Sequence, residues 1–362
     1  GSPSSGALAS VAVLSRVTNE VKHKTADGIV WDQALVGVAL FERDAVQTLK
    51  NAQATITFDP ENFLEMSENS LVIIRRLGGS RILRSRRSFM IVVTGRLRGR
   101  IDGSTSGNVK LQIALPTGVA EIDTRDSLHQ TTEFEINVLE DASATITVFK
   151  GLAKVRANGK TVNVNANEST LIEKMAAPAR PQQVLNAVDL KAPVSQKIVY
   201  YRDFPPEIWF DWGEIKKGKT YAFQISKKNR FTNLVVSENL TQSEFLYGNL
   251  KKGIYFWRVA AVDEKGIRGR WSPVRKIEVV QLLTPPKLRV SFPSKDGIIN
   301  ETAIIVRGVS DRQAKIYING DDPQMRNTEG FSHEVLLKKG VNLILVESVD
   351  QVGNVSFERR LI

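Results

Sequence analysis

Hydrophobic and polar residues alternate along most of this chain, which is the pattern of half-buried β-strands. The alternating runs are rich in Val, Ile and Thr, and turn signals such as Asn158-Gly159 and Asn319-Gly320 separate them. The clearest runs are 54–58, 134–139, 144–149, 161–166, 302–308, 314–320 and 341–348. The best candidate for a helix is a short segment, residues 181–191. The pattern therefore predicts an all-β protein.

The most informative run is 253–279, which reads as two strands joined by the turn DEKGIRG. Tyr255 and Trp257 share one face of the first strand, and Trp271 directly precedes the second strand. A hairpin this rich in aromatic residues predicts the end of a β-sandwich module, with the aromatic rings in its core.

Two proline-containing linkers predict the domain boundaries. They lie at 175–183, with Pro178 and Pro181, and at 282–287, with Pro285 and Pro286. We therefore expect domains at 7–176, 184–281 and 287–362. The opening GSPSSG, residues 1–6, has the composition of an expression-vector remnant, and we expect that a native signal or anchor has been removed with it.

Composition narrows the choice of class. A chain of 362 residues is long enough for two or three domains. It has no Cys, which excludes disulfides, Cys-based zinc sites and thiol nucleophiles. No apolar run approaches the roughly 18–20 residues of a membrane-spanning helix, so no transmembrane segment is expected.

The net charge of +11 is concentrated unevenly. Residues 177–281 are basic as a whole, whereas the first domain is nearly neutral but strongly polarised. Within it, residues 75–100 carry arginines and no acidic residue: Arg75, Arg76, Arg81, Arg84, Arg86, Arg87, Arg96, Arg98 and Arg100.

Arginine in preference to lysine favours bidentate recognition of carboxylate or phosphate. The stretch is therefore a candidate site for an envelope protein partner or for an anionic cell-wall or outer-membrane polymer. The alternative is that these side chains are the solvated faces of two strands and a loop. Acidic residues elsewhere in the domain would then balance them: Glu61, Glu65, Glu68, Glu133, Glu135 and Asp141. Nucleic acid is not expected as a partner, because no nucleic-acid-binding motif accompanies the stretch.

Trp209 is the second candidate contact residue. It neighbours Phe210 in the run IWFDW, and alternation cannot bury both on the face that holds Trp212. We expect Trp209 to be exposed and available to a ligand or to another module.

Residues 8–175 resemble the FecR-like domain of bacterial envelope proteins. The matching residues follow the order of that family's pattern: Trp31 to Ala34; Gly37, Leu40, Asp44, Val46 and Thr48; Ala54, Ile56, Phe58, Asp59, Leu64 and Met66; Asn69-Ser70; LRGRI at 97–101; LPTGVAEI at 115–122; and the closing repeat at 134–172. Asn19-Glu20, Arg43 and Pro60 stand where the family has glycine, and Glu168 stands where it has Gln.

The resemblance implies a β-domain of short, solenoid-like strands without enzymatic activity. Some family members relay a signal from an outer-membrane transporter to a membrane-bound anti-sigma region, and others are stand-alone envelope proteins. The resemblance therefore implies a periplasmic or cell-surface location.

The two following segments resemble sandwich modules. Residues 184–281 resemble a fibronectin type III-like module through Trp212, YAFQIS at 221–226 and LKKGIYFWRVAAVD at 250–263. Residues 287–362 resemble a bacterial immunoglobulin-like module through AKIYING at 314–320 and DQVGN at 350–354. Such modules are spacers and adhesion units.

No constellation for catalysis, cofactor binding or metal binding is evident. The three histidines, His23, His129 and His333, fall far apart, and no nucleophile, metalloprotease, phosphate-binding or dinucleotide motif occurs. Calcium at Asp321-Asp322 and Asp350 is a weak alternative, because the acids lie in separate turns.

The sequence thus predicts a non-enzymatic envelope protein whose first domain binds a partner while two sandwiches act as spacers. Two alternatives stay open: a periplasmic signal-relay sensor of the anti-sigma regulator kind, and a carbohydrate-binding appendage of a polysaccharide enzyme. The oligomeric state is not determined by the sequence.

Overall fold

The structure is a computed structural model that describes residues 10–75, 86–104, 109–124, 131–323, 325–327 and 329–362, with the backbone alone at 86–88 and 325–326. The described residues form 32 strands and no α-helix, which confirms the all-β prediction. They fall into two compact units: Gly1–Leu190 with Trp212–Ser243 and Trp257–Val274, and Lys191–Asp211 with Glu244–Phe256 and Arg275–Ile362.

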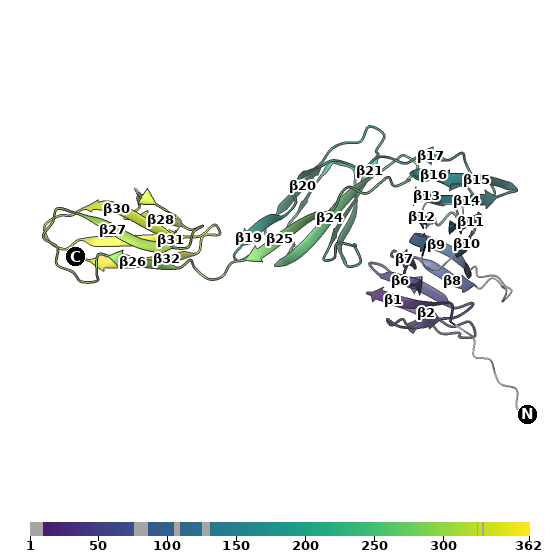
Figure 1. The fold of residues 1–362 in the computed structure, drawn as a ribbon, viewed down its shortest axis with the longest axis horizontal. Coiled ribbons are helices and arrows are strands. Elements are labelled where there is room, and N and C mark those ends of the chain that lie inside the picture. The colour runs from purple at the N-terminus through teal and green to yellow at the C-terminus, as the bar shows by residue number, and fades with distance from the viewer. Residues whose placement is uncertain (1–9, 76–85, 105–108, 125–130, 324, 328) are drawn as a thin grey trace, which may run out of the picture. The chain divides into compact units, whose positions relative to one another are not determined.

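Strands β1 to β17 form an N-terminal β-domain of two sheets (Figure 1). In strand order, the first sheet contains β4 (Ala39–Leu40), β1 (Ala12–Thr18), β6 (Gln53–Asp59), β7 (Asn62–Met66), β9 (Arg86–Asp102), β12 (Thr131–Val138), β13 (Ala144–Lys150), β16 (Glu168–Ile172) and β17 (Gln182–Gln183). The second contains β3 (Asp32–Gln33), β2 (Val21–Lys24), β5 (Ala45–Thr48), β8 (Leu71–Arg75), β9 again, β10 (Val109–Leu115), β11 (Gly118–Asp123), β14 (Leu152–Ala157) and β15 (Lys160–Asn165).

The chain passes repeatedly from one sheet to the other, as a solenoid-like arrangement of short strands predicts. The exception is β9, whose 17 residues belong to both sheets. Its first half pairs with β8 and β10, and its second half pairs with β7 and β12. Gly95 lies where the partners change, with a φ of +96° that favours glycine.

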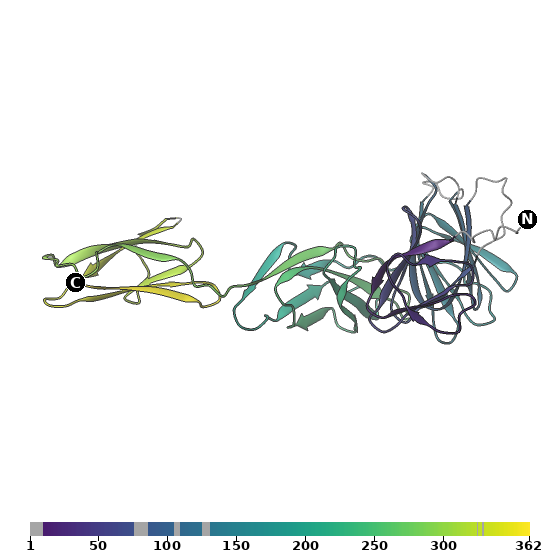
Figure 2. The same ribbon diagram turned by 90° about the horizontal axis from the view of Figure 1, so that it is seen from below.

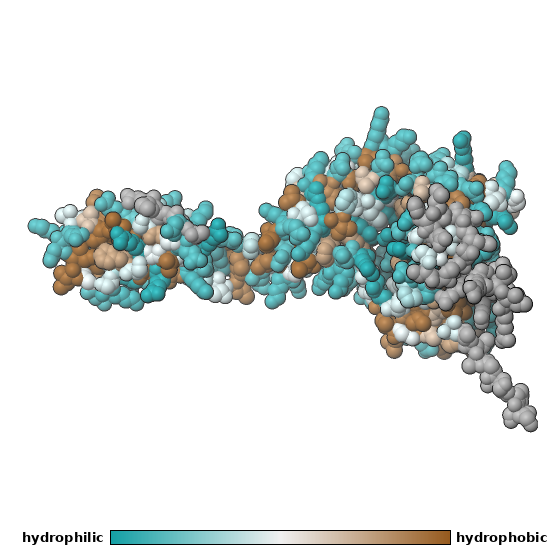
Figure 3. Space-filling view, viewed as in Figure 1, coloured by the Kyte–Doolittle hydropathy of each residue, from teal (hydrophilic) through white to brown (hydrophobic). Residues whose placement is uncertain are grey.

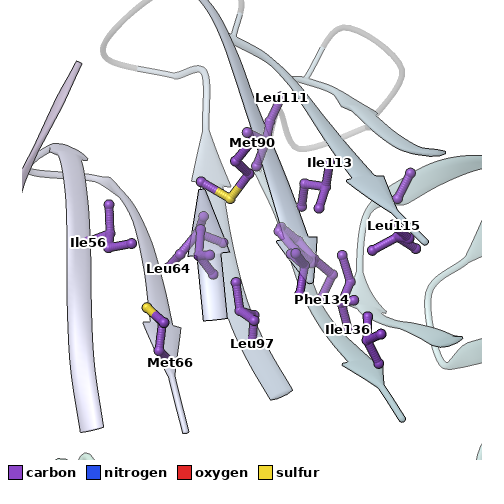
Figure 4. Close-up of a cluster of buried hydrophobic side chains, with 14 of the residues drawn as sticks. Ile56, Leu64, Met66, Met90, Leu97, Leu111, Ile113, Leu115, Phe134 and Ile136 are labelled. Atoms are coloured by element: carbon purple, nitrogen blue, oxygen red, sulfur yellow. The ribbon is translucent and has the colours of Figure 1, made fainter. Parts of the chain in front are cut away.

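One hydrophobic core fills the space between these sheets. Figure 4 shows Leu64 of β7, Leu97 of β9 and Phe134 of β12 in this cluster. Gly99 of β9 lies against the Phe134 ring, and a Cβ atom at this position would overlap it. The alternation of Arg96, Arg98 and Arg100 with buried Leu97, Gly99 and Ile101 is thus the result of one strand face packing into the core.

The second sandwich has a three-stranded and a five-stranded sheet. The strand orders are β18-β20-β23 and β19-β25-β24-β21-β22. Their bounds are β18 (Leu190–Ala192), β19 (Lys197–Tyr201), β20 (Ile208–Trp212), β21 (Thr220–Ser226), β22 (Leu234–Leu240), β23 (Glu244–Tyr247), β24 (Gly253–Val262) and β25 (Arg275–Gln281). The predicted hairpin is confirmed, because β24 and β25 are neighbours in the sheet.

The aromatic core of this sandwich is largely as predicted. Trp212, Tyr255 and Trp257 are buried, and the Trp212 ring stacks on Phe223 with centroids 5.7 Å apart. Trp271 differs from the prediction, because it is only partly buried.

Residues 181–191, the best helix candidate in the sequence, form no helix. In this segment Gln182–Gln183 form β17, which pairs with β16, and the segment ends in β18. A short helix is marginal in water without tertiary support, and here the neighbouring strand edges supply backbone partners instead. The linker before it is also bound to the domain, because Ala179 N donates to Leu171 O at 2.8 Å.

The C-terminal sandwich has two sheets with strand orders β26-β27-β30-β29 and β28-β31-β32, which Figure 2 shows as separate layers. The bounds are β26 (Leu288–Phe292), β27 (Ala303–Ser310), β28 (Lys315–Ile318), β29 (Met325–Arg326), β30 (Gly330–Leu336), β31 (Leu343–Val349) and β32 (Val355–Leu361). Its surface carries hydrophobic residues among the hydrophilic ones (Figure 3). Exposed apolar side chains of this sandwich include Leu336, Val341 and Phe357.

Candidate functional site

The predicted arginine stretch is divided by the structure. Arg76, Arg81 and Arg84 lie outside the described residues, and Arg86 and Arg87 are described only as backbone of β9. Arg75 ends β8 with an exposed side chain. The structure therefore brings together Arg96, Arg98 and Arg100, which are half-buried on one face of β9.

Acidic residues lie opposite these arginines on both neighbouring strands. Arg98 is in register with Glu65 of β7 and with Glu135 of β12, and Arg100 is in register with Glu133. Opposite charges placed directly across a sheet attract each other. The balancing acids that the solvated-face interpretation invokes thus include direct cross-strand neighbours of these arginines.

Arg100 has two acidic neighbours. Its Nη2 lies 3.4 Å from Asp102 Oδ2, and its Nη1 lies 4.0 Å from Glu133 Oε1. Burial would raise the pKa of Asp102, but hydrogen bonds from the Ser104 hydroxyl and amide, from Thr131 and from Arg100 outweigh it and lower this pKa to about 2. This carboxylate stays ionised and stabilises the end of β9.

Glu135 is the centre of a buried ion pair in the first compact unit. Its Oε2 accepts a hydrogen bond from Nη2 of Arg268, and its Oε1 lies 3.7 Å from Nε of Arg96. Burial alone would raise the pKa of Glu135, yet the guanidinium groups of Arg268 and Arg96 hold it below its usual value. Glu135 belongs to the N-terminal β-domain and Arg268 to the loop after β24, so this pair joins two segments far apart in sequence.

Arginines and aromatic rings alternate in a column beside this ion pair, which we call the arginine–aromatic column. The guanidinium of Arg258 lies 3.9 Å from the ring centroid of Phe231 and 4.1 Å from that of Trp271. The guanidinium of Arg268 lies 4.4 Å from the Trp271 centroid and 5.4 Å from that of Phe149. Each distance is within the range of a cation–π contact.

Backbone and polar contacts reinforce the same interface within the first compact unit. Thr18 Oγ1 donates to the Thr232 carbonyl at 3.3 Å, and Arg270 N donates to the Leu185 carbonyl at 3.0 Å. Together with the arginine–aromatic column, these contacts attach β21, β22 and residues 257–274 to the N-terminal β-domain.

A cavity of about 670 Å³ lies at this interface. Arginine side chains from several elements line it: Arg16, Arg96, Arg98, Arg230, Arg258 and Arg268. Among its acidic lining residues are Glu65 and Glu135, and Trp271 and Gln224 also contribute. Its volume is in the range of small-molecule sites.

Trp209 is exposed, as alternation predicts, with 51% of its surface accessible. Its Nε1 donates to Glu244 Oε2 at 3.0 Å. Phe210 and Trp212, which lie on the opposite face of β20, are buried. Whether Trp209 contacts a ligand stays a prediction.

The remaining polar clusters have structural partners. His23 Nε2 lies 3.1 Å from Asp44 Oδ2, and the Asp44 carboxylate accepts hydrogen bonds from two backbone amides. Asp350 accepts hydrogen bonds from the amides of Val352 and Asn354 at 2.9 Å, so it closes its own turn. In the described part of the chain, no group of three or more His, Asp or Glu side chains is placed to hold a metal ion.

The sequence pattern did not single out Arg258 or Arg268, and it did not predict that Glu135 is buried and paired with Arg268. Arg258 occupies an outward position on an alternating strand, where a solvated side chain is the usual expectation. Arg268 lies in a turn, and its partner Glu135 is 133 residues away. The only signal was the concentration of positive charge in residues 177–281.

Comparison with known proteins matches the C-terminal sandwich to one family. Residues 286–362 match the family of glucodextranase domain B. Over 203 residues the chain is 26% identical to an uncharacterized protein of Treponema pallidum (strain Nichols), and the match covers 53% of this chain and 27% of that protein. The chain therefore matches about a quarter of that relative's length.

Similar solved structures are more distant. The fibronectin(III)-like modules of Clostridium thermocellum CbhA are 17% identical, with a TM-score of 0.34, over 48% of this chain and 92% of that chain. A proposed anti-sigma factor from Parabacteroides distasonis is 9% identical, with a TM-score of 0.29, over 44% of this chain and 79% of that chain.

No helix in the described ranges has the length and apolar character that crossing a membrane requires. The strand orders show an all-β chain with β-sandwich modules, and its residues 286–362 are similar to glucodextranase domain B.

Proposed function

We propose that the chain is a non-enzymatic scaffold of the bacterial cell envelope. The N-terminal β-domain presents a binding surface to an envelope protein or to an anionic polymer of the cell wall or outer membrane, and the sandwiches act as spacers. The protein acts in the periplasm or at the cell surface.

This proposal rests on an observation about three polar residues, which are placed at an interface inside the first compact unit. Arg258, Arg268 and Glu135 join the N-terminal β-domain to strands β21, β22 and residues 257–274. A buried ion pair holds these segments in one relative arrangement, because an arrangement that leaves either charge buried and unpaired is costly in free energy. Such a joint suits a protein that holds a binding surface in place.

The FecR-like resemblance has support in the buried polar residues of the N-terminal β-domain. Asp44 and Thr48 of the matching motif are buried and accept or donate hydrogen bonds to backbone groups. Asn19 and Arg43, which replace glycines of the family pattern, have φ of 58° and 70°. These are left-handed conformations in which glycine is the preferred residue. We propose on this basis that the domain is FecR-like.

The signal-relay and carbohydrate-binding functions are the alternatives. The exposed ring of Trp209 favours the second, because indole rings serve as platforms for apolar ligand faces. A glycan array probed with the full chain tests it, and binding that is lost in Trp209→Ala would replace the scaffold proposal.

The proposal is tested by affinity capture with the full chain against peptidoglycan sacculi and outer-membrane extracts. We expect saturable retention of the wild type, and loss of retention when Arg84, Arg86 and Arg87 are each replaced by Glu. The matched control replaces three exposed lysines, Lys216, Lys217 and Lys219, by Glu. Equal recovery of all three proteins would overturn the assignment of the binding surface, and no retention of the wild type would overturn the proposed function.

A further inference from the structure

The cavity at the interface is lined by six arginines and five glutamates, and several of the arginines have no carboxylate within ion-pair distance among the described residues. Arg96, Arg98, Arg258 and Arg268 all line it. Glu135 is already engaged by Arg268 and Arg96. Arg98 and Arg258 are two arginines of the cavity that form no ion pair with a described residue.

Arg258 lies half-buried in the cavity wall. Its Nε and Nη2 donate to Gln224 Oε1 at 3.0 and 2.8 Å, and its faces are covered by Phe231 and Trp271. No carboxylate lies within ion-pair distance of it among the described residues. Burial lowers the pKa of Arg258, and the nearby charges of Arg98 and Arg268 lower it further, against the opposite effect of Glu65 and Glu135. A cation removed from water in this position is stabilised by an anion.

Arg98 and Arg268 have donors that no protein group uses in the described ranges. Arg98 forms no hydrogen bond and no ion pair with a described residue, although Glu65 and Glu135 flank it in register. The Nε of Arg268 is buried without a hydrogen-bond partner among the described residues, and the exposed fraction of the whole side chain is 2%. Unused donors in a buried site point to a ligand that accepts from them.

We propose that this cavity binds a small ligand through an oxyanion group, a carboxylate or a phosphate, held by Arg98 and Arg258. Guanidinium groups donate paired hydrogen bonds to both kinds of oxyanion. Trp271 is covered on its faces by Arg258 and Arg268, so the ring supports the cations and does not serve as a sugar platform. The site goes beyond the proposed scaffold function, which needs only an outer surface.

Isothermal titration calorimetry on the full chain, with citrate and inorganic pyrophosphate as probes at constant ionic strength, tests the proposal. Quenching of tryptophan fluorescence supplies a second readout, because Trp271 stacks on Arg258. We expect saturable binding that weakens about tenfold or more in Arg98→Gln, since a hydrogen bond to a charged group is lost. The tighter probe identifies the ligand as a carboxylate or a phosphate.

Arg75→Gln is the matched control, because Arg75 belongs to the same arginine stretch, is exposed and does not line the cavity. It should leave both affinities unchanged. Arg258→Lys keeps the charge but removes the planar donor fork, and should also weaken binding. The proposal is overturned if neither probe binds saturably, or if Arg98→Gln binds as tightly as the wild type. Envelope capture depends on different arginines, so failure of one proposal is distinguishable from failure of the other.

Discussion

Removing Arg268 should destabilise the first compact unit strongly. Arg268→Met leaves the Glu135 carboxylate buried, with Arg96 at 3.7 Å as its remaining ion-pair partner. Breaking a buried pair by removing one partner costs about 3–5 kcal/mol. Loss of the cation–π contacts with Trp271 and Phe149 adds about 0.5–2 kcal/mol, of which packing of the Met side chain recovers part.

A double-mutant cycle separates the ion pair from the packing. The double variant Glu135→Gln, Arg268→Met has no buried carboxylate to leave unpaired, so it should be more stable than Arg268→Met alone. We expect a coupling energy of about 2–3 kcal/mol between the two positions. Urea unfolding followed by tryptophan fluorescence is the assay, because Trp31, Trp212, Trp257 and Trp271 lie in this unit and the C-terminal sandwich contains no Trp.

The pH dependence supplies an independent check on the same pair. The folded-state pKa of Glu135 is lowered, so its contribution to stability is present above the ordinary glutamate pKa. That contribution is lost as pH falls through the ordinary value towards the folded one, and Glu135→Gln should lack this dependence. A coupling energy below about 0.5 kcal/mol, the value of an exposed pair, would refute the reasoning.

Three further predictions concern single residues. Gly99→Ala should cost about 1–3 kcal/mol because the added methyl group overlaps the Phe134 ring, and urea unfolding should show partial rescue in the double variant with Phe134→Leu; no rescue would contradict this account. Asp102→Asn should lower the stability at neutral pH by about 1–2 kcal/mol, because its pKa of about 2 lies below the unfolded value. Wild-type stability should then fall as pH drops from about 4 to 2, more steeply than in this variant, and parallel profiles would count against it. Trp209→Ala should change the free energy of unfolding by no more than about 0.5 kcal/mol, as for other exposed side chains, and a larger loss would give the ring a structural role.

The fold followed from the sequence wherever one strand face determines burial. Alternation in IWFDW placed Trp212 inside and Trp209 outside, and the structure agrees. The same rule failed for Trp271, which lies after a turn and outside any strand. Its ring lies between the guanidinium groups of Arg258 on β24 and Arg268 in its own loop, and strand periodicity carries no information about these contacts.

Only part of the candidate site could be predicted from the sequence. The arginines of β9 were visible as a run without acids, and Glu65 and Glu135 as acids that could balance them, but only the sheet register places these acids directly opposite Arg98. Arg268 and Glu135 are brought together by the packing of distant segments, for which a single sequence offers no signal.

The account depends on the attachment of residues 212–243 and 257–274 to the N-terminal β-domain. The chain has no Cys, so a cysteine pair introduced at Thr18 and Thr232 can be tested without interfering thiols. Thr18 Oγ1 lies 3.3 Å from the Thr232 carbonyl. Oxidation, or bridging with a short thiol-reactive cross-linker, should give an intramolecular link by mass spectrometry that neither single variant forms. Free thiols or only intermolecular products would contradict the account.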